Sequence, residues 1–223
     1  MKNILKTISI LSILFISCSK TDEVPNTILT PPSANENKIL FDANIGNNSH
    51  LFTMNIDGTN EKQITNFTDG TNYVSTYEGS WSPDGTKIIF LSNKDKDGGS
   101  KIYTINSDGT NLVRINHNAR DEDSPKFSPD GKKIVFDANV GNNTHIFTMN
   151  IDGTNEKQIT NFTDGTNYVS AYTGSWSPDG TKIIFLSNKD KDGGSKIYTI
   201  NSDGTNLVRI NHNVRGEDSP TWK

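Results

Sequence analysis

The sequence is an internal duplication, and this limits the chain to folds built from similar units. Residues 38–128 match residues 133–223 almost throughout. The exchanges at apolar positions are conservative, as where Leu40 is replaced by Val135 in the second half, and a packed core tolerates such changes. We call two residues that this alignment pairs copies of each other. Such a repeat is typical of arrays and propellers, in which each unit packs on the next.

A shorter repeat lies within each long one. A segment of Lys, Ile, an apolar residue and Phe begins at Lys38, Lys87, Lys133 and Lys182, close to the period of about 40–50 residues that propeller blades have. Around it, turns rich in Pro, Asp, Asn and Gly separate four short apolar segments. Each unit therefore predicts an antiparallel sheet of four strands.

The predicted strands are apolar on both sides, which a single sheet in water cannot satisfy. Neighbouring residues of a strand point to opposite faces, and Ile102 and Tyr103 are neighbours that are both large. Sheets stacked face to face around an axis cover both sides. The pattern therefore predicts an all-β fold, a four-bladed β-propeller made of four-stranded antiparallel blades.

The end of the sequence resembles the start of a blade. Residues 220–223 match 125–128, the predicted innermost strand of a blade, and the unit beginning at Lys38 has no such segment before it. We therefore expect the C-terminal strand to join the first blade and close the ring, which removes exposed strand edges. A monomer closed in this way is favoured over two chains that exchange their ends. The expected blades are 38–65 plus 217–223, 72–116, 122–160 and 167–211.

Residues 1–17 have the features of a secretory signal peptide. Lys2 and Lys6 precede a short apolar run that is followed by a small residue. The run is too short to remain as a membrane span. The segment resembles a bacterial lipoprotein signal, and the resemblance implies that Cys18 carries a lipid and becomes the mature N-terminus.

Residues 18–37 are polar, contain prolines and lack any periodicity, which predicts a flexible tether to the propeller at 38–223. Lipid attachment would be the protein's contact with the membrane. Ser19, in place of Asp after the cysteine, is typical of lipoproteins that reach the outer membrane. We therefore expect the protein in the cell envelope, anchored at the outer membrane and facing the periplasm or the surface.

The repeated unit also has a family signature. Its order of Ser-Pro-Asp-Gly, Ile-Phe, Ile-Tyr and Asp-Gly-Thr-Asn resembles the WD-like propeller repeat of the TolB family, over essentially residues 38–223. The Ser-Pro-Asp-Gly turn stands at 82–85, 128–131 and 177–180. The resemblance implies interaction with proteins of the envelope. Our leading expectation is a protein without enzymatic activity.

The net charge of −4 excludes nucleic acid as a partner, because binding to phosphates needs a basic surface. We expect a binding module for a protein or glycan of the envelope. An alternative is a propeller enzyme that cleaves polysaccharides, a lyase or hydrolase, for which Asp42 and Asp137 are the acidic candidates at matching places. A purely structural envelope protein is the third possibility.

Aromatic residues in and beside the loops before the innermost strands are candidates for ligand binding. Rigid aromatic rings with polar tips suit a sugar or a peptide, and the alternative is that they fill the channel and pack on the tryptophans. The candidates are Phe67, Tyr73, Tyr77, Trp81, Phe162, Tyr168, Tyr172 and Trp176.

Two loops match the first half of a calcium-binding loop, with alternate oxygen ligands before a glycine. The interleaved lysines and the absence of a Glu at the last ligand position weaken this match. No cofactor is therefore expected, and a solvated hairpin is the alternative to calcium. The candidate ligands are Asn93, Asp95, Asp97, Asn188, Asp190 and Asp192.

Overall fold

The computed structural model describes residues 37–68, 73–95, 99–115, 120–163, 169–190, 193–210, 218 and 220–222. The predicted signal, the lipid-attachment residue Cys18 and all but the last residue of the predicted tether lie outside this part of the chain. Within the described residues, no helix is long and apolar enough to cross a membrane.

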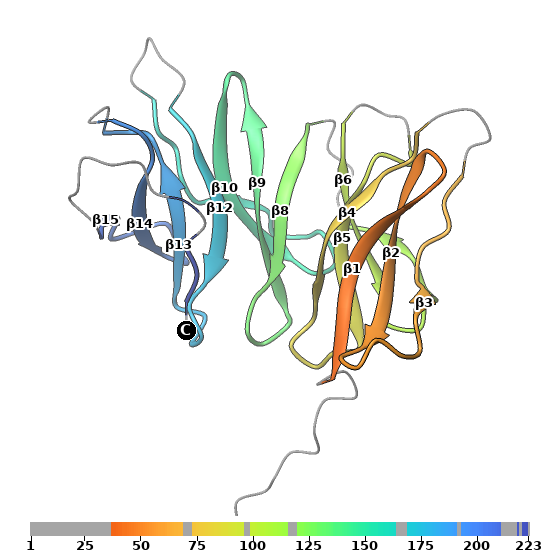
Figure 1. Ribbon diagram of the computed structural model, residues 1–223. Helices are drawn as coiled ribbons and strands as arrows, with labels where there is room; N and C mark the ends of the chain where they lie inside the picture. Colours follow the sequence, from red (N-terminus) through yellow and green to blue (C-terminus); the bar gives the residue numbers. More distant parts are fainter. Residues whose placement is uncertain are drawn as a thin grey trace, which may run out of the picture. The chain divides into compact units, whose positions relative to one another are not determined.

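The described residues form β-strands in four antiparallel sheets, which confirms the prediction of an all-β fold (Figure 1). Strands that follow each other in the sequence lie side by side in every sheet. The first sheet contains β1 (Lys38–Ile45), β2 (Asn48–Asn55) and β3 (Lys62–Gln63). The second contains β4 (Thr76–Trp81), β5 (Lys87–Ser92), β6 (Lys101–Asn106) and β7 (Val113–Arg114).

The third and fourth sheets repeat the four-stranded order of the second. The third contains β8 (Glu122–Phe127), β9 (Lys133–Val140), β10 (Asn143–Asn150) and β11 (Lys157–Gln158). The fourth contains β12 (Ala171–Trp176), β13 (Lys182–Ser187), β14 (Lys196–Asn201) and β15 (Val208–Arg209).

The turn after each innermost strand is held by side chains that the repeat supplies. In the second sheet, the Ser82 hydroxyl donates to Asp84 at 2.6 Å and accepts the backbone N–H of Lys87 at 2.9 Å. Gly85 takes a positive φ of 68°, which an L residue adopts only with strain. The same hydroxyl contacts recur at Ser128 and Ser177.

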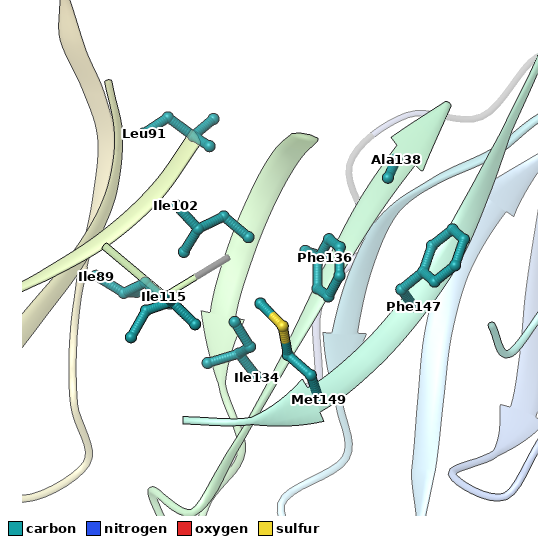
Figure 2. Close-up of a cluster of buried hydrophobic side chains, with 9 residues drawn as sticks. All are labelled: Ile89, Leu91, Ile102, Ile115, Ile134, Phe136, Ala138, Phe147 and Met149. Atoms are coloured by element: carbon teal, nitrogen blue, oxygen red, sulfur yellow. The ribbon is translucent and has the colours of Figure 1, made fainter. Parts of the chain in front are cut away.

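Each interior sheet buries apolar side chains on both faces, as the sequence predicts. Ile88 and Phe90 of β5 belong to the core shared with the first sheet, whereas Ile89 and Leu91 belong to the core shared with the third. Figure 2 shows this second core, where side chains of the second sheet face Phe136 and its neighbours on the third. A further core joins the third sheet to the fourth.

In the part of the C-terminal segment that the structure describes, the predicted closing strand is not formed. Residues 220–222 have no strand conformation, the first sheet has three strands among the described residues, and its strands do not touch those of the fourth sheet. The physical difference is in how far apart the paired segments lie in the sequence. β4, β8 and β12 each pair with the strand that directly follows them, whereas residues 220–222 would have to pair with β1 at the other end of the domain, and the entropic cost of bringing two segments together rises with the length of chain between them.

Candidate functional site: an acidic cleft at the innermost strands

The innermost strands of the second, third and fourth sheets are β4, β8 and β12, and they share an irregularity in their pairing. The pairing of β4, β8 and β12 with the next strand shifts register at the same position in each. Glu78, Ser124 and Thr173 stand there with φ values of 55°, 50° and 55°. Residues other than glycine rarely adopt such angles, and β-bulges of this kind often re-aim side chains at functional sites.

These bulges border a polar cleft of about 560 Å³ between the second, third and fourth sheets. Hydroxyl and amide groups of β9, β10 and β12 form part of its wall. Its most distinctive feature is the number of carboxyl groups. They are Glu78, Asp121, Glu122, Asp123 and Asp137.

Asp137 is almost completely buried, with 3% of its surface exposed. One oxygen, Oδ1, has no hydrogen-bond partner among the described residues, while the carboxylate accepts the backbone N–H of Thr173. Burial raises the pKa of Asp137 well above its ordinary value, and the negative charges of Asp123 and Glu78 raise it further. A cation bound beside Asp137 would oppose both effects and favour the charged carboxylate.

Glu78 and Asp123 approach each other across the gap between β4 and β8. The backbone N–H of Ser124 donates to Glu78 Oε2 at 2.9 Å and to Asp123 Oδ1 at 3.0 Å. Although Glu78 as a whole is exposed, partial burial of its carboxyl group first, and then the charge of Asp123, raise its pKa. Two carboxylates that share one donor leave most of their acceptor capacity for a ligand.

Glu122 is also buried, with 3% of its surface exposed, and accepts the backbone N–H of Ile102. Burial raises the pKa of Glu122 to about 7, although the charges of Arg120 and Lys101 oppose the rise. The Arg120 guanidinium lies 4.3 Å from the centre of the Phe147 ring and forms an ion pair with Glu156. The cleft therefore contains a carboxyl group that titrates near neutral pH.

This titration gives a testable dependence of stability on pH. The folded protein holds the Glu122 proton more tightly than the unfolded chain, so the contribution of Glu122 to stability is lost as pH rises through about 7. Between pH 5 and pH 7.5 we expect the free energy of unfolding to fall by about 2 kcal/mol more in the wild type than in Glu122→Gln. Urea denaturation at both pH values measures the difference, and equal pH dependence of the two proteins would contradict it.

Four of the predicted aromatic residues contact groups of the protein itself. Phe67 stacks on Phe90, with ring centres 6.4 Å apart, and Phe162 stacks on Phe185 at 6.3 Å. The hydroxyl groups of two tyrosines contact serine hydroxyls in the neighbouring loops. These pairs are Tyr77 with Ser100 and Tyr172 with Ser195.

The other predicted aromatics are more varied. Trp81 is partly buried in the core between the first two sheets, and Trp176 is 8% exposed in the core between the last two. Tyr73 is 68% exposed, whereas Tyr168 lies outside the described residues. Of the aromatic candidates that the structure describes, Tyr172 is the one that lines the cleft. Their role in ligand binding stays a prediction.

The oxygen atoms of the predicted calcium loops contact nearby protein groups. Asp95 Oδ1 pairs with Lys94 at 2.5 Å, while Oδ2 accepts from the Tyr103 hydroxyl at 2.5 Å and from Arg114 at 3.2 Å. Asp190 repeats these contacts with Lys189, Tyr198 and Arg209.

The remaining calcium candidates divide into two groups. Asn93 and Asn188 accept backbone N–H groups at 2.8 Å, while Asp97 and Asp192 lie outside the described part of the chain. No group of three or more His, Cys, Asp or Glu residues positioned for a metal occurs among the described residues. Calcium binding by these loops stays a prediction.

Sequence reasoning identified only one member of the cleft by its acidity. Asp137 was a candidate together with its copy Asp42, but the structure buries Asp137 and leaves Asp42 exposed. Glu78 and Asp123 were missed, because only the register shift brings them together. The signal available in the sequence was positional, since Glu78 and Ser124 stand the same distance before their Ser-Pro-Asp-Gly turns.

Comparison with known proteins identifies the fold. The family model of the TolB beta propeller domain matches residues 20–223. The Tol-Pal system protein TolB of Francisella tularensis subsp. mediasiatica is 28% identical, over 80% of this chain and 49% of that protein. The chain spans about half the length of the curated relatives it matches.

Two solved structures support the same conclusion about the fold. A TolB-like protein of Agrobacterium tumefaciens superposes with a TM-score of 0.65 and 21% identity, over 79% of this chain and 62% of the other. TolB of Acinetobacter baumannii superposes with a TM-score of 0.62 and 23% identity, over 79% and 42%. Together with the four sheets, these matches confirm the predicted propeller fold.

Proposed function

This chain belongs to the TolB beta propeller domain family, and on that premise we propose that it is a binding module for a protein of the cell envelope. The carboxyl groups of the cleft receive cationic side chains, Lys or Arg, of that partner. The protein is not an enzyme in this proposal. It is exported, lipidated at Cys18 and anchored at the outer membrane, so that the cleft faces an envelope partner.

The observation that carries the proposal is the convergence of Glu78, Asp123 and Asp137 on one cleft, where burial and mutual repulsion raise the pKa of Glu78 and Asp137. The positive charge of a bound cation would offset the repulsion between these carboxyl groups. Arginine also matches the geometry of carboxylates with its planar set of donors. A protein partner is favoured over a neutral glycan, since a sugar hydroxyl would leave the repulsion between the carboxylates uncompensated.

The relatives support the proposed location in the cell envelope. The name of the Francisella protein assigns it to the Tol-Pal system, and we transfer only the general setting, an envelope assembly, to this chain. Of the aromatic candidates, the proposal keeps Tyr172, which lines the cleft. There it could stack against a guanidinium group of the partner.

Binding of a tetra-arginine peptide, measured by isothermal titration calorimetry at pH 7.5, tests the proposal. We expect Glu78→Gln to raise the dissociation constant about fivefold, since one partly solvent-exposed charge pair contributes about 1 kcal/mol. Glutamine can still accept the N–H of Ser124, so the bulge is preserved. Glu61→Gln is the matched control, because Glu61 is also exposed and lies outside the cleft.

The outcome depends on the comparison of the two variants. Equal weakening by Glu78→Gln and Glu61→Gln would mean that only the net charge attracts the peptide. No binding by the wild type would contradict the proposal directly. Binding that weakens with salt in the wild type, and less so in Glu78→Gln, would support the cleft as the site.

A further inference from the structure

Two sheets each have one apolar face on which no other described sheet packs. On the first sheet, Ile39 is 38% exposed, although its copy Ile134 is fully buried. On the fourth sheet, Ile210 is 52% exposed, whereas its copy Ile115 is 5% exposed. These differences do not come from the sequence, since each pair is identical in residue type. They arise because no described sheet packs on that side.

The two open faces are copies of two faces that already pack together. Ile115 of the second sheet and Ile134 of the third belong to the same buried core, shown in Figure 2. Other residues of this core also have copies on the open faces. On the second sheet Ile89 and Ile102 correspond to Ile184 and Ile197, and on the third sheet Phe136 and Met149 correspond to Phe41 and Met54.

A backbone contact shows how closely these faces fit. A Cβ atom on Gly153, in the turn after β10, would lie 2.2 Å from the carbonyl oxygen of Ile115. The corresponding glycines of the second and fourth sheets also lie close to the preceding sheet. A Cβ atom on Gly109 would lie 3.2 Å from the carbonyl oxygen of Ile64, and one on Gly204 would lie 3.3 Å from that of Ile159. Gly58, the copy of Gly153, has nothing within 4 Å.

We propose that two copies of this chain associate through these faces, with the fourth sheet of each packed on the first sheet of the other. Within one chain the strands of the first and fourth sheets do not touch, so each chain presents two complementary apolar faces. A two-fold arrangement uses both faces of both chains and leaves none exposed. Large exposed apolar patches are uncommon on monomers, and this arrangement removes them.

The partner also fits the unpaired edge of the first sheet. β1 pairs only with β2 in the described part of the chain. Residues 220–222 are copies of 125–127 of β8, which pairs with β9, the copy of β1. In the dimer, residues 220–222 of one chain lie beside β1 of the other and complete its sheet. The association is therefore an interface between copies, built from contacts that the chain already uses internally.

Sedimentation velocity of the full chain over a range of concentrations tests the proposal. We expect a species of twice the mass of the chain in the experiment, which is 24.6 kDa when all 223 residues are present. Ile210→Asp should raise the dimer dissociation constant about thirtyfold or more, as the loss of a central interface contact does. Val208→Asp is the matched control, because Val208 and its copy Val113 are both 42% exposed and neither depends on a neighbouring sheet.

A second pair of variants tests the backbone contact. Gly58→Asn should weaken the dimer, because its Cβ would meet the carbonyl of the partner's Ile210, and asparagine tolerates the positive φ of 80°. Gly46→Asn, at a φ of 60°, should leave it intact, since neither Gly46 nor its copy Gly141 has any atom within 4 Å. A wild type that stays monomeric, or one that grows into longer chains, would overturn the two-fold dimer.

Discussion

Phe136→Ala is expected to lower the free energy of unfolding by about 3–5 kcal/mol, the usual cost of removing a large buried aromatic ring. Phe136 is fully buried at the centre of the core between the second and third sheets, and its ring stacks on Phe147 with centres 5.6 Å apart (Figure 2). The loss of stability has two parts, the apolar contacts of the ring and the cavity left behind. The cavity stays open because the two packed sheets cannot move together to fill it. Urea denaturation followed by circular dichroism measures it.

The duplication supplies the control for this experiment. Phe41, the copy of Phe136, stacks on Phe52 at the same 5.6 Å but is partly exposed on the open face of the first sheet. Phe41→Ala should therefore cost about half as much in dilute solution, where the chains are separate. At high concentration the dimer would bury Phe41 and increase its cost. Equal losses for the two variants in dilute solution would mean that both faces are already covered within one chain.

Most of the fold could be predicted because it depends on local pattern. The alternation of Ile88 and Ile89, each buried in a different core, shows in the sequence as strands that are apolar on both faces. The hydroxyl contacts of Ser82 with Asp84 and Lys87 lie within a few residues, so the repeated motif determines the turn by itself. Both the strand pattern and the turn motif occur several times in the sequence, because the unit is repeated.

The rest depended on contacts between distant segments. The strand expected at 220–223 needed a partner at the other end of the sequence, and no local signal determines whether that contact forms. The cleft depended on a register shift that turns Glu78 toward Asp123, although residue type alone does not indicate a bulge. For the same reason Asp137 and Asp42 were equivalent in sequence, yet only Asp137 is covered by neighbouring strands.

The second large loss of stability is expected at Gly153, which contacts a residue of a different sheet. Gly153 has a φ of 83°, and a Cβ atom there would lie 2.2 Å from the Ile115 carbonyl oxygen of the second sheet. Gly153→Ala therefore adds the strain of a positive φ, about 1–2 kcal/mol, to the cost of forcing two packed sheets apart, about 1–3 kcal/mol. We expect the free energy of unfolding to fall by about 3–4 kcal/mol in total, measured by urea denaturation.

Gly141→Ala separates the two contributions, because Gly141 lies in the hairpin of the same sheet with a φ of 63° and no atom within 4 Å of a new Cβ. It should lose only the strain of about 1–2 kcal/mol. The excess for Gly153→Ala then measures how rigidly the third sheet is held against the second. If the two variants lost the same stability, the sheets would be free to separate at little cost, and the close packing that both the cleft and the proposed dimer require would be absent.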